Sequence, residues 1–202
     1  MLKRIYFFTI LLMFANNSFA NSEVSAYVDH LLKKTLSILR NNELGTEEKI
    51  SISQNLIEQN MDLPWMSKFV LGKYRRSLTE DQISQFTKLY SSYIVKSYAN
   101  AVRFYKPEQT ISIRSQSPIS KDEYVVKTFL NSPNADPIRI DYVIRKFDGD
   151  KFKVFDIVTE GISLINSNQA EFGNVISNSS FEKLLEDLDN KVSSLNASNI
   201  HG

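Results

Sequence analysis

The hydrophobic pattern of this chain changes its period at Pro107, and this change limits the possible folds more than any other feature of the sequence. Before Pro107, apolar residues recur every three to four positions, which is typical of helices that bury one side. After it, apolar and polar residues alternate, for example from Ile138 to Arg145, as expected for strands with one buried face. A helical period returns after Ser163. Helices, then strands, then helices predict an α+β domain, with the helices on one face of a curled sheet.

Three helices are expected before residue 78. The first two are indicated by apolar stripes at helical spacing, formed by Val24, Val28, Leu31, Leu32, Thr35, Ile38 and Leu39, and then by Leu56, Ile57 and Met61. We expect Gly45 to end the first helix and Thr46 to cap the second, because threonine is a favoured N-cap residue. Asp62 is expected to cap a short third helix, which Gly72 ends in a left-handed conformation.

A fourth helix, long and bent, is predicted between Thr79 and Pro107. Thr79 and Gln82 form a capping-box pattern at its start. Its apolar stripe is unusually aromatic and includes Phe86, Tyr90, Tyr93, Tyr98 and Tyr105. A filled core is the commoner origin of such a stripe. Because buried tyrosine hydroxyls need hydrogen-bond partners, we interpret this stripe as the rim or wall of a cavity.

Four strands are predicted after Pro107, at residues 111–114, 124–130, 138–145 and 152–158. Their connections are short, which favours an antiparallel meander, with Asp148-Gly149 as the tight turn between the last two strands. Two helices are expected to complete the domain, one from Ser163 to Ile176 and one opened by Ser179. The sequence therefore predicts N-terminal helices, a four-stranded curled antiparallel sheet and C-terminal helices.

Residues 1–20 have the pattern of a cleavable secretory signal. The pair Lys3-Arg4 precedes an apolar run from Ile5 to Phe14, which is too short to span a bilayer. Ser18 and Ala20 place small residues where a signal peptidase needs them, so cleavage is expected after Ala20. The alternative is an uncleaved N-terminal anchor, which the polar residues directly after the apolar run disfavour.

Composition argues against several classes of protein. The sequence contains no cysteine, so it forms no disulfide and has no lipoprotein cleavage site. Its 24 basic and 23 acidic side chains give a formal net charge of +1, a balance that argues against nucleic-acid binding. No apolar run of membrane-spanning length follows the leader. We expect one soluble domain over residues 21–195, held together by core burial alone, and a flexible tail over 196–202.

The sequence offers no motif for a metal or a cofactor. His30 and His201 are its only histidines, and without cysteine they predict no zinc or thiol site. The six glycines form no phosphate-binding loop, and no serine has a nucleophile-elbow pattern. Arg75 and Arg76 are candidates to meet a phosphate, although adjacent arginines in a helix connection are usually solvated. We expect no catalytic residue, no metal and no cofactor.

Three acidic residues, Asp141, Asp156 and Glu160, are the remaining candidates for catalysis. Asp141 and Asp156 lie in strands that are expected to pair, so an acid/base pair facing across a cavity is one interpretation. The commoner role for such residues is a hydrogen-bonded or solvent-facing polar position. An enzyme that uses Asp141 or Asp156 as a base therefore stays an alternative.

A series of motifs runs through the chain from about residue 25 to 192. In the first half these are Asp62, Met66, Val70-Leu71-Gly72, Tyr74-Arg75, Thr79, Gln82, Phe86, Tyr98, Ala101 and Tyr105. In the second half they are Ile138-Arg139-Ile140-Asp141-Tyr142, Phe152 to Ile157, Glu160 to Ile165, Phe172, Leu184 and Leu188. The run Glu160-Gly161-Ile162-Ser163-Leu164 is the most specific. In this order, the motifs resemble the MlaC (toluene-tolerance) family of periplasmic phospholipid-binding proteins.

The resemblance implies a shuttle of the system that maintains lipid asymmetry in the outer membrane of Gram-negative bacteria. Such a protein is periplasmic, is not an enzyme, and carries glycerophospholipid as its cargo without any other cofactor. The implied partners are an outer-membrane lipoprotein–porin complex and an inner-membrane ABC transporter with a lipid-channelling periplasmic subunit. We expect a monomer with an apolar cavity between the sheet and the helices.

Ten residues are expected to line that cavity and contact the lipid. They lie on the predicted sheet, directly after its last strand, and on two helices: Ile138, Ile140, Tyr142, Ile162, Leu164, Met66, Phe69, Val70, Tyr90 and Tyr98. Periodicity identifies the buried side of an element, but it does not distinguish a lined cavity from a filled core. Besides the enzyme, one further alternative stays open, a chaperone-like module that binds apolar protein segments.

Overall fold

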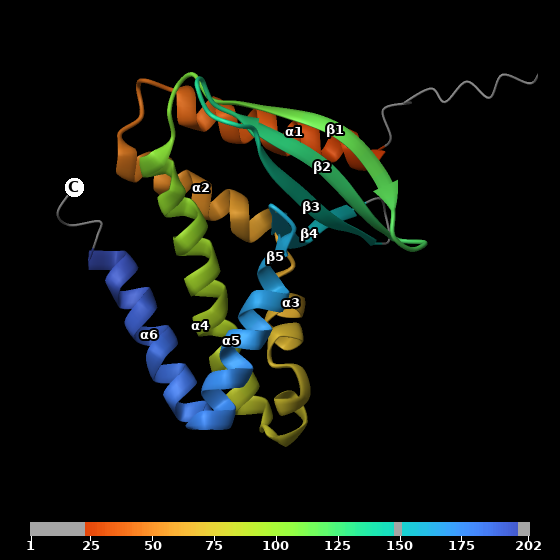
Figure 1. The fold of residues 1–202 in the computed structure, drawn as a ribbon. Helices are drawn as coiled ribbons and strands as arrows, with labels where there is room; N and C mark the ends of the chain where they lie inside the picture. Colours follow the sequence, from red (N-terminus) through yellow and green to blue (C-terminus); the bar gives the residue numbers. More distant parts are fainter. Residues whose placement is uncertain (1–22, 148–150, 198–202) are drawn as a thin grey trace, which may run out of the picture.

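The structure, a computed structural model, describes residues 23–147 and 151–197. The expected signal at residues 1–20 and the Asp148-Gly149 turn lie outside the described residues. The α+β class is confirmed (Figure 1), and the elements follow in this order: α1 (Glu23–Arg40), α2 (Thr46–Asn60), α3 (Leu63–Val70), η1 (Gly72–Ser77), α4 (Glu80–Ala99), η2 (Asn100–Phe104), β1 (Thr110–Pro118), β2 (Glu123–Asn131), β3 (Ile138–Phe147), β4 (Lys151–Thr159), β5 (Ile162–Ser163), α5 (Leu164–Asn178) and α6 (Phe181–Ala197).

The sheet is an antiparallel meander in which each strand pairs with the next, in the order β1-β2-β3-β4-β5. The described strands number five, where the sequence predicted four. The additional strand, β5, is two residues long and returns along β4, with Ile162 opposite Thr159. The chain reverses at Glu160 and Gly161, whose φ angles are 49° and 83°. A glutamate rarely adopts a positive φ, so the sequence gives little indication of this turn.

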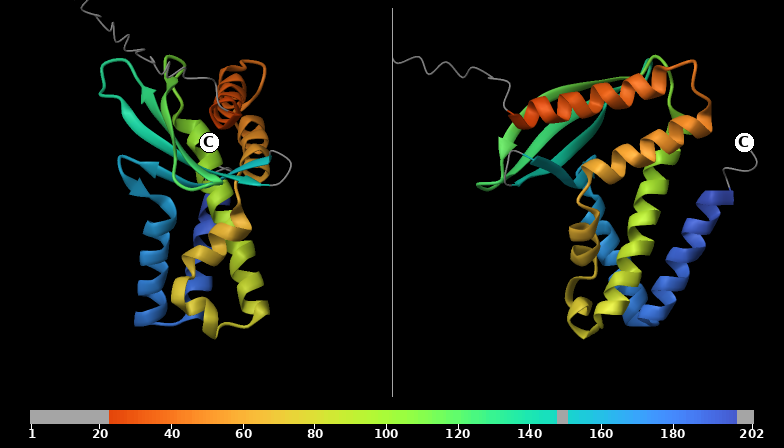
Figure 2. Two further views of the ribbon diagram at one scale, coloured as in Figure 1. Left: turned by 90° about the vertical axis from the view of Figure 1, so that its right-hand side faces the viewer. Right: turned by 180° about the vertical axis from the view of Figure 1, so that it is seen from behind.

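The molecule has two parts, which we call the upper part and the lower part as they lie in Figure 1. The upper part is the sheet with α1 and α2, and the lower part consists of α3, α5, α6 and the beginning of α4 (Figures 1 and 2). α3, α5 and α6 extend away from the sheet instead of covering its face. At one junction between the parts, where α2 passes into α3, the Asp62 N–H donates to the Val154 carbonyl at 2.8 Å.

An aromatic cluster forms the centre of the lower part. Phe86 and Tyr90, about one turn apart on α4, stack with 5.7 Å between their ring centroids. The Phe172 ring of α5 meets both of them edge-on, at 5.9 Å from each. All three side chains are fully buried, and the Tyr90 hydroxyl accepts a hydrogen bond from Asn168 Nδ2 at 3.0 Å. Aromatic pairs of this kind add about 0.5–1.5 kcal/mol each beyond the burial of their area, so this core is both filled and satisfied.

Three helix termini form as the sequence predicts. The Gln82 N–H donates to Thr79 Oγ1 at 3.2 Å and the Thr79 N–H donates to Gln82 Oε1 at 2.9 Å, which completes the capping box of α4. Asp62 caps α3 by accepting from the Trp65 N–H at 3.3 Å. Gly72 follows α3 with a φ of +53°, the left-handed conformation that favours glycine.

The boundaries of the first two helices differ from the prediction. α1 ends at Arg40, five residues before Gly45. Gly45 is instead the N-cap of α2, with extended backbone, so Thr46 is already the first helical residue. The predicted threonine cap was wrong because glycine also suits the N-cap position, where the backbone is not yet helical.

The end of the chain differs as well. α6 is capped by Ser180, whose Oγ accepts from the Lys183 N–H at 3.1 Å, and not by Ser179. The helix continues to Ala197, so the first two residues of the expected tail are helical, and residues 198–202 lie outside the described part. None of the helices in the described ranges is both long and apolar enough to cross a membrane.

Candidate functional site

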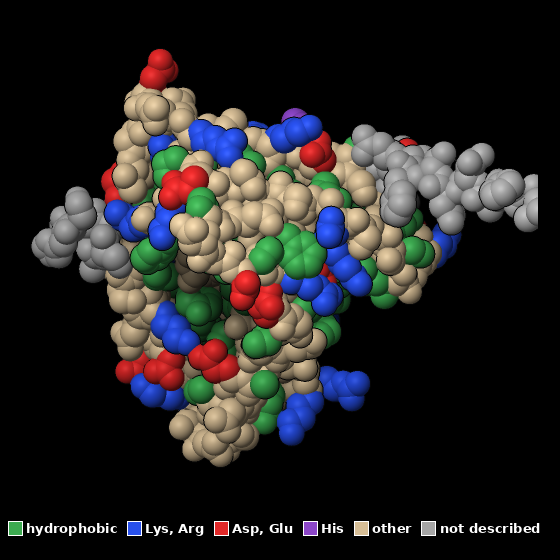
Figure 3. Space-filling view, turned by 45° about the horizontal axis from the view of Figure 1, so that its top comes forward, with side chains coloured by type: hydrophobic (Ala, Val, Ile, Leu, Met, Phe, Trp, Pro, Cys, Tyr) green, Lys and Arg blue, Asp and Glu red, His purple; other side chains and the backbone are tan. Residues whose placement is uncertain are grey.

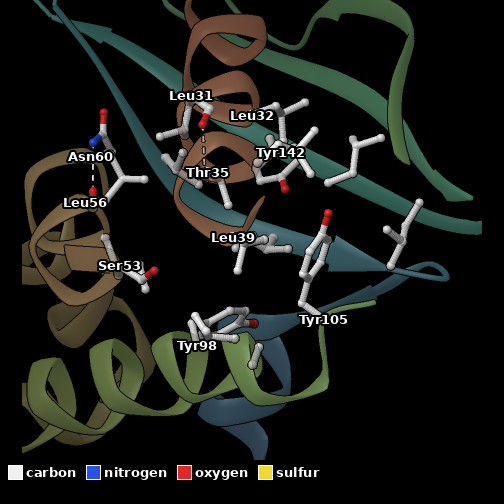
Figure 4. A pocket seen from close by; sticks show the side chains of 18 of the residues that line it. Leu31, Leu32, Thr35, Leu39, Ser53, Leu56, Asn60, Tyr98, Tyr105 and Tyr142 are labelled. Atoms are coloured by element: carbon white, nitrogen blue, oxygen red, sulfur yellow. Dashed lines mark hydrogen bonds between the residues drawn. The ribbon is translucent and has the colours of Figure 1, made fainter. Parts of the chain in front are cut away.

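A cavity of about 300 Å³ lies in the upper part, between α1, α2, η2 and the sheet. Its wall is mostly apolar, and Figure 4 shows side chains from both helices and from the strands converging on one space. The lining residues are Leu31, Leu32, Thr35, Leu36, Leu39, Ser53, Leu56, Ile57, Asn60, Met61, Tyr98, Ala101, Val102, Tyr105, Gln109, Ile111, Leu130, Tyr142, Val154 and Ile157. An apolar, concave site of this kind is the usual form of a small-molecule binding site.

The cavity has a buried end and an open end. At the buried end, Met61 and Val154 are 6% and 2% exposed. At the other end Ala101 is exposed, and its neighbours Tyr105 and Gln109 are half-buried. We call this open end, where the last turn of α1 meets η2 and the start of β1, the mouth of the cavity.

Two polar side chains of the helical walls, Thr35 and Asn60, are hydrogen-bonded within the protein. The Thr35 hydroxyl donates to the Leu31 carbonyl of its own helix at 2.9 Å. Asn60 Nδ2 donates to the Leu56 carbonyl at 2.7 Å (Figure 4), and its Oδ1 accepts from the Tyr27 hydroxyl at 3.0 Å. Satisfied polar groups no longer need water, so the wall favours an apolar occupant.

The sheet contributes to the wall through an irregularity in β4. Tyr142 of β3 lies opposite Ile157, but two residues further along β3 Ile144 lies opposite Val154, because Phe155 is an extra residue on β4. This β-bulge brings Val154 and Ile157, three positions apart, to the same cavity. Strict alternation would have placed them on opposite faces.

Two tyrosine hydroxyls face the cavity without a partner. Burial raises the pKa of Tyr142 to about 12. Burial also raises the pKa of Tyr98 to about 12, with a smaller contribution from the charge of Asp156. Both phenols are therefore protonated at neutral pH, and neither has a hydrogen-bond partner among the described residues. The wall thus offers a ligand two polar contacts inside an otherwise apolar space.

The structure brings two of the ten expected lipid-contact residues, Tyr98 and Tyr142, to the cavity wall. The other eight do not line this cavity. Four of them belong to the lower part, where Met66, Val70 and Tyr90 are fully buried in the core and Phe69 stacks on Trp65 at 5.1 Å. Met66, Val70 and Tyr90 fill space that is already closed by neighbouring side chains, and Phe69 is half-buried.

The remaining four lie at the outer end of β3 and around β5. Ile138 is 43% exposed and Ile162 is 67% exposed. Ile140 and Leu164 are half-buried outside the cavity wall. Ile138 and Ile140 alternate correctly with Tyr142, and Ile138 lies opposite Leu130 of the wall, so Ile138 lies beside the cavity without lining it.

Neither of the acidic candidates for catalysis lines the cavity. Asp141 is buried and forms an ion pair with Arg139 on the same strand. Asp156 holds the start of α5, because its two oxygens accept from Ser163 Oγ at 2.6 Å and from the Ile165 N–H at 3.2 Å. Each carboxylate is thus committed to a structural contact.

The other candidates from the sequence are separate from the cavity. Glu160 accepts a hydrogen bond from the Arg139 N–H in the turn before β5. Arg75 and Arg76 are exposed in η1, in the lower part. His30 is exposed on α1, and the described residues contain no cluster of side chains able to hold a metal ion.

Most of the wall was missed by sequence reasoning. The stripe of α1, with Leu31, Leu32, Thr35 and Leu39, was recognised as a buried face, but not as a cavity wall. The same holds for Leu56 and Ile57 of α2. An available signal was Ser53 on the inner face of α2, since a small side chain leaves space beside its partner.

An α+β domain with an apolar cavity that opens to solvent defines a binding protein for an apolar ligand. The model of the MlaC protein family matches residues 29–190, and the chain belongs to this family. It is similar to the intermembrane phospholipid transport system binding protein MlaC of Haemophilus influenzae, with 21% identity over 183 residues, 86% of this chain and 85% of that protein.

A solved structure has the same fold. It is that of a phospholipid-binding protein from Ralstonia solanacearum in complex with a phospholipid, with a TM-score of 0.67 and 22% sequence identity. The match covers 87% of this chain and 98% of that chain. The resemblance to the MlaC family that the motifs indicated is thus confirmed.

Proposed function

We propose that this protein binds a glycerophospholipid with its acyl chains in the upper cavity and carries it between two membranes. The observation that carries the proposal is the apolar cavity, open at one end, between α1, α2, η2 and the sheet. Two similarities support it: the relative from Haemophilus influenzae is named as a phospholipid transport binding protein, and the structure from Ralstonia solanacearum contains a phospholipid.

The physical need for a carrier follows from the hydrophobic effect. A diacyl lipid hides roughly 30 methylenes from water, and at about 0.8 kcal/mol each their exposure costs on the order of 20 kcal/mol. Free diffusion through water is therefore negligible. A cavity that encloses the tails, with its mouth at the surface, removes most of this cost and leaves the charged head group in solvent.

The size of the cavity bears on how the lipid is held. Its volume of about 300 Å³ is at the lower end of the roughly 300–1,000 Å³ that is usual for ligand pockets. Two acyl chains need more space than this. We expect α1 and α2 to move away from the sheet when both chains enter.

The proposed location is the periplasm, after cleavage of residues 1–20. The proposed partners are an outer-membrane lipoprotein–porin complex and an inner-membrane ABC transporter with its periplasmic subunit. These proposals rest on membership of the MlaC family. On the face seen in Figure 3, basic and acidic side chains are interspersed, and no broad basic surface of the kind that binds a polyanion is visible there.

The experiment is mass spectrometry of an organic extract from the purified protein, expressed as the full chain in a Gram-negative host. We expect phospholipid in a stoichiometric amount. Replacing Ile157 in the cavity wall, Ile157→Arg, places a charge among the acyl chains and is expected to lower the bound lipid about tenfold or more.

The matched control is Ile162→Arg, which adds the same charge at an exposed position outside the wall. We expect this variant to retain its lipid. A wild-type protein without lipid contradicts the proposed function, and equal losses in the two variants contradict the assignment of the cavity. If Ile157→Arg fails to fold, Leu39→Trp, which fills the cavity from α1, takes its place.

A further inference from the structure

A guanidinium group is fixed at the mouth of the cavity. Arg40 is the last residue of α1 and is exposed. Its Nε donates to the Tyr105 hydroxyl at 3.0 Å, and its Nη2 donates to the Gln109 carbonyl at 3.0 Å. Tyr105 and Gln109 both line the cavity. The cation is therefore held at the edge of the apolar space by two residues of its wall.

Arg40 has hydrogen-bonding capacity left. A guanidinium carries five N–H donors, and these two contacts use two of them. None of the ion pairs found in residues 23–147 and 151–197 involves Arg40. A cation in the last turn of a helix is favourable for the helix dipole, but that role does not require contacts with Tyr105 and Gln109. These contacts orient the remaining donors beside the mouth.

A second cation, on α2, contacts the last turn of α1. Lys49 of α2 is half-buried and donates through Nζ to the Leu39 carbonyl at 2.8 Å. Within the described residues it too has no carboxylate partner. The neighbouring Arg103 differs, because it is paired with Glu47. Two cations without a carboxylate partner among the described residues are therefore hydrogen-bonded to residues of the cavity wall, Tyr105 and Leu39.

We propose that Arg40, assisted by Lys49, binds the phosphate of the lipid head group at the mouth while the acyl chains occupy the cavity. Arginine suits this role because its planar fork matches the oxygens of a phosphate. The affinity comes mainly from burial of the acyl chains. The contact with Arg40 is exposed, and its role is to add selectivity for lipids that carry a phosphate. This inference rests on the proposed function and names the polar half of the same site.

The test compares two ligands with the same acyl chains, dioctanoyl phosphatidylglycerol and dioctanoylglycerol, which lacks the phosphate. Binding to the delipidated full chain is measured by isothermal titration calorimetry. We expect the wild type to bind the phospholipid about tenfold more tightly than the diacylglycerol, as one charge-assisted contact allows. Arg40→Gln is expected to reduce this preference to about twofold or less, without changing the affinity for diacylglycerol.

The matched control is Arg76→Gln, an exposed arginine in the lower part, away from the mouth. It is expected to keep the full preference. Added salt provides a second measurement that needs no variant, because it should weaken binding of the phospholipid and leave that of diacylglycerol unchanged. Arg40→Lys, which keeps the charge but loses the fork, is expected to keep an intermediate preference.

The outcomes separate this inference from the proposed function. If the wild type binds neither ligand, the carrier proposal fails and the head-group contact fails with it. If both ligands bind equally, or if Arg40→Gln keeps the tenfold preference, the carrier proposal stands and the role of Arg40 is overturned. If inorganic phosphate alone binds in an Arg40-dependent way while the two lipids bind equally, the site is a free-phosphate site and the head-group assignment is overturned.

Discussion

Tyr90 and Tyr98 lie about two helical turns apart on α4, yet they belong to opposite kinds of environment. Tyr90, in the lower part, is fully buried against Phe86 and Phe172, and its hydroxyl is bonded to Asn168. Tyr98, in the upper part, forms part of a cavity wall, and its hydroxyl has no partner among the described residues. The helix α4 thus runs from a closely packed core in the lower part to the wall of a cavity in the upper part.

The difference shows that the two parts of the domain have different roles. In the lower part, the side chains of Phe86 and Tyr90 are fully buried among partner atoms, so their dispersion contacts are nearly complete. In the upper part, the side chains around the cavity lack such contacts on one side, and a ligand can supply them. The lower part therefore stabilises the fold, and the upper part keeps the space that the proposed function needs.

The largest expected effect of a single substitution comes from deleting a leucine side chain in each part. Leu71 is 1% exposed in the lower core, so Leu71→Ala leaves a new cavity and is expected to cost about 3 kcal/mol of the free energy of unfolding. Leu39→Ala, in the existing cavity wall, is expected to cost only about 1 kcal/mol. Urea unfolding of the delipidated variants measures both. Equal losses of the free energy of unfolding in the two variants would contradict the difference between a closely packed lower part and an upper part that contains a cavity.

High pH is expected to destabilise the upper part, because Tyr98 and Tyr142 ionise there. The pKa values of Tyr98 and Tyr142 are raised to about 12 in the folded protein, against 10.0 for an exposed tyrosine. The folded state holds these protons more tightly, so stability is complete below pH 10 and falls as the pH rises toward 12. The expected loss is about 1.4 kcal/mol per pH unit for each tyrosine.

The measurement is urea unfolding across this pH range for the wild type and for a double variant, Tyr98→Phe with Tyr142→Phe. The double variant should lose less stability on alkalinisation, because it has two fewer groups to titrate. If its stability falls as steeply as that of the wild type, the two phenols are not the cause.

The smallest expected effect is that of removing a single hydroxyl group, and this change compares Tyr90 and Tyr98 directly. Tyr90→Phe removes the acceptor of the Asn168 side chain and leaves a buried N–H without its partner, at an expected cost of about 1–2 kcal/mol. Tyr98→Phe removes a hydroxyl that has no partner, so its effect on the free energy of unfolding should be within about 0.5 kcal/mol. Thermal unfolding checks both, and a larger loss for Tyr98→Phe would contradict the comparison.

Much of the fold follows from local sequence. The change of period at Pro107, the capping box at Thr79 and the cap at Asp62 each depend on residues near one another in the chain, and each is confirmed. β5 was missed because its turn needs a positive φ at Glu160, a conformation set by the surrounding fold and not by the residue.

The cavity was harder to predict, for physical reasons. An apolar stripe has the same period whether its partner surface touches it or stops short, so Met66 and Tyr98 look alike in the sequence. The β-bulge at Phe155, which turns Val154 and Ile157 to one side, has no signal in the alternation of β4. Tyr98 and Tyr142 line the cavity, whereas Tyr90, expected there by the same argument about tyrosine hydroxyls, is buried with its hydroxyl bonded to Asn168.

The central claim is that acyl chains occupy the upper part and not the lower part. The most direct measurement uses a phospholipid with a nitroxide spin label on its acyl chain, bound to protein with labelled leucine and isoleucine methyl groups. The account predicts that NMR signals of Leu39, Leu56 and Ile157 broaden, whereas those of Leu184 and Leu188 stay sharp. Broadening of the lower-part methyl groups, with Leu39, Leu56 and Ile157 unaffected, would contradict it.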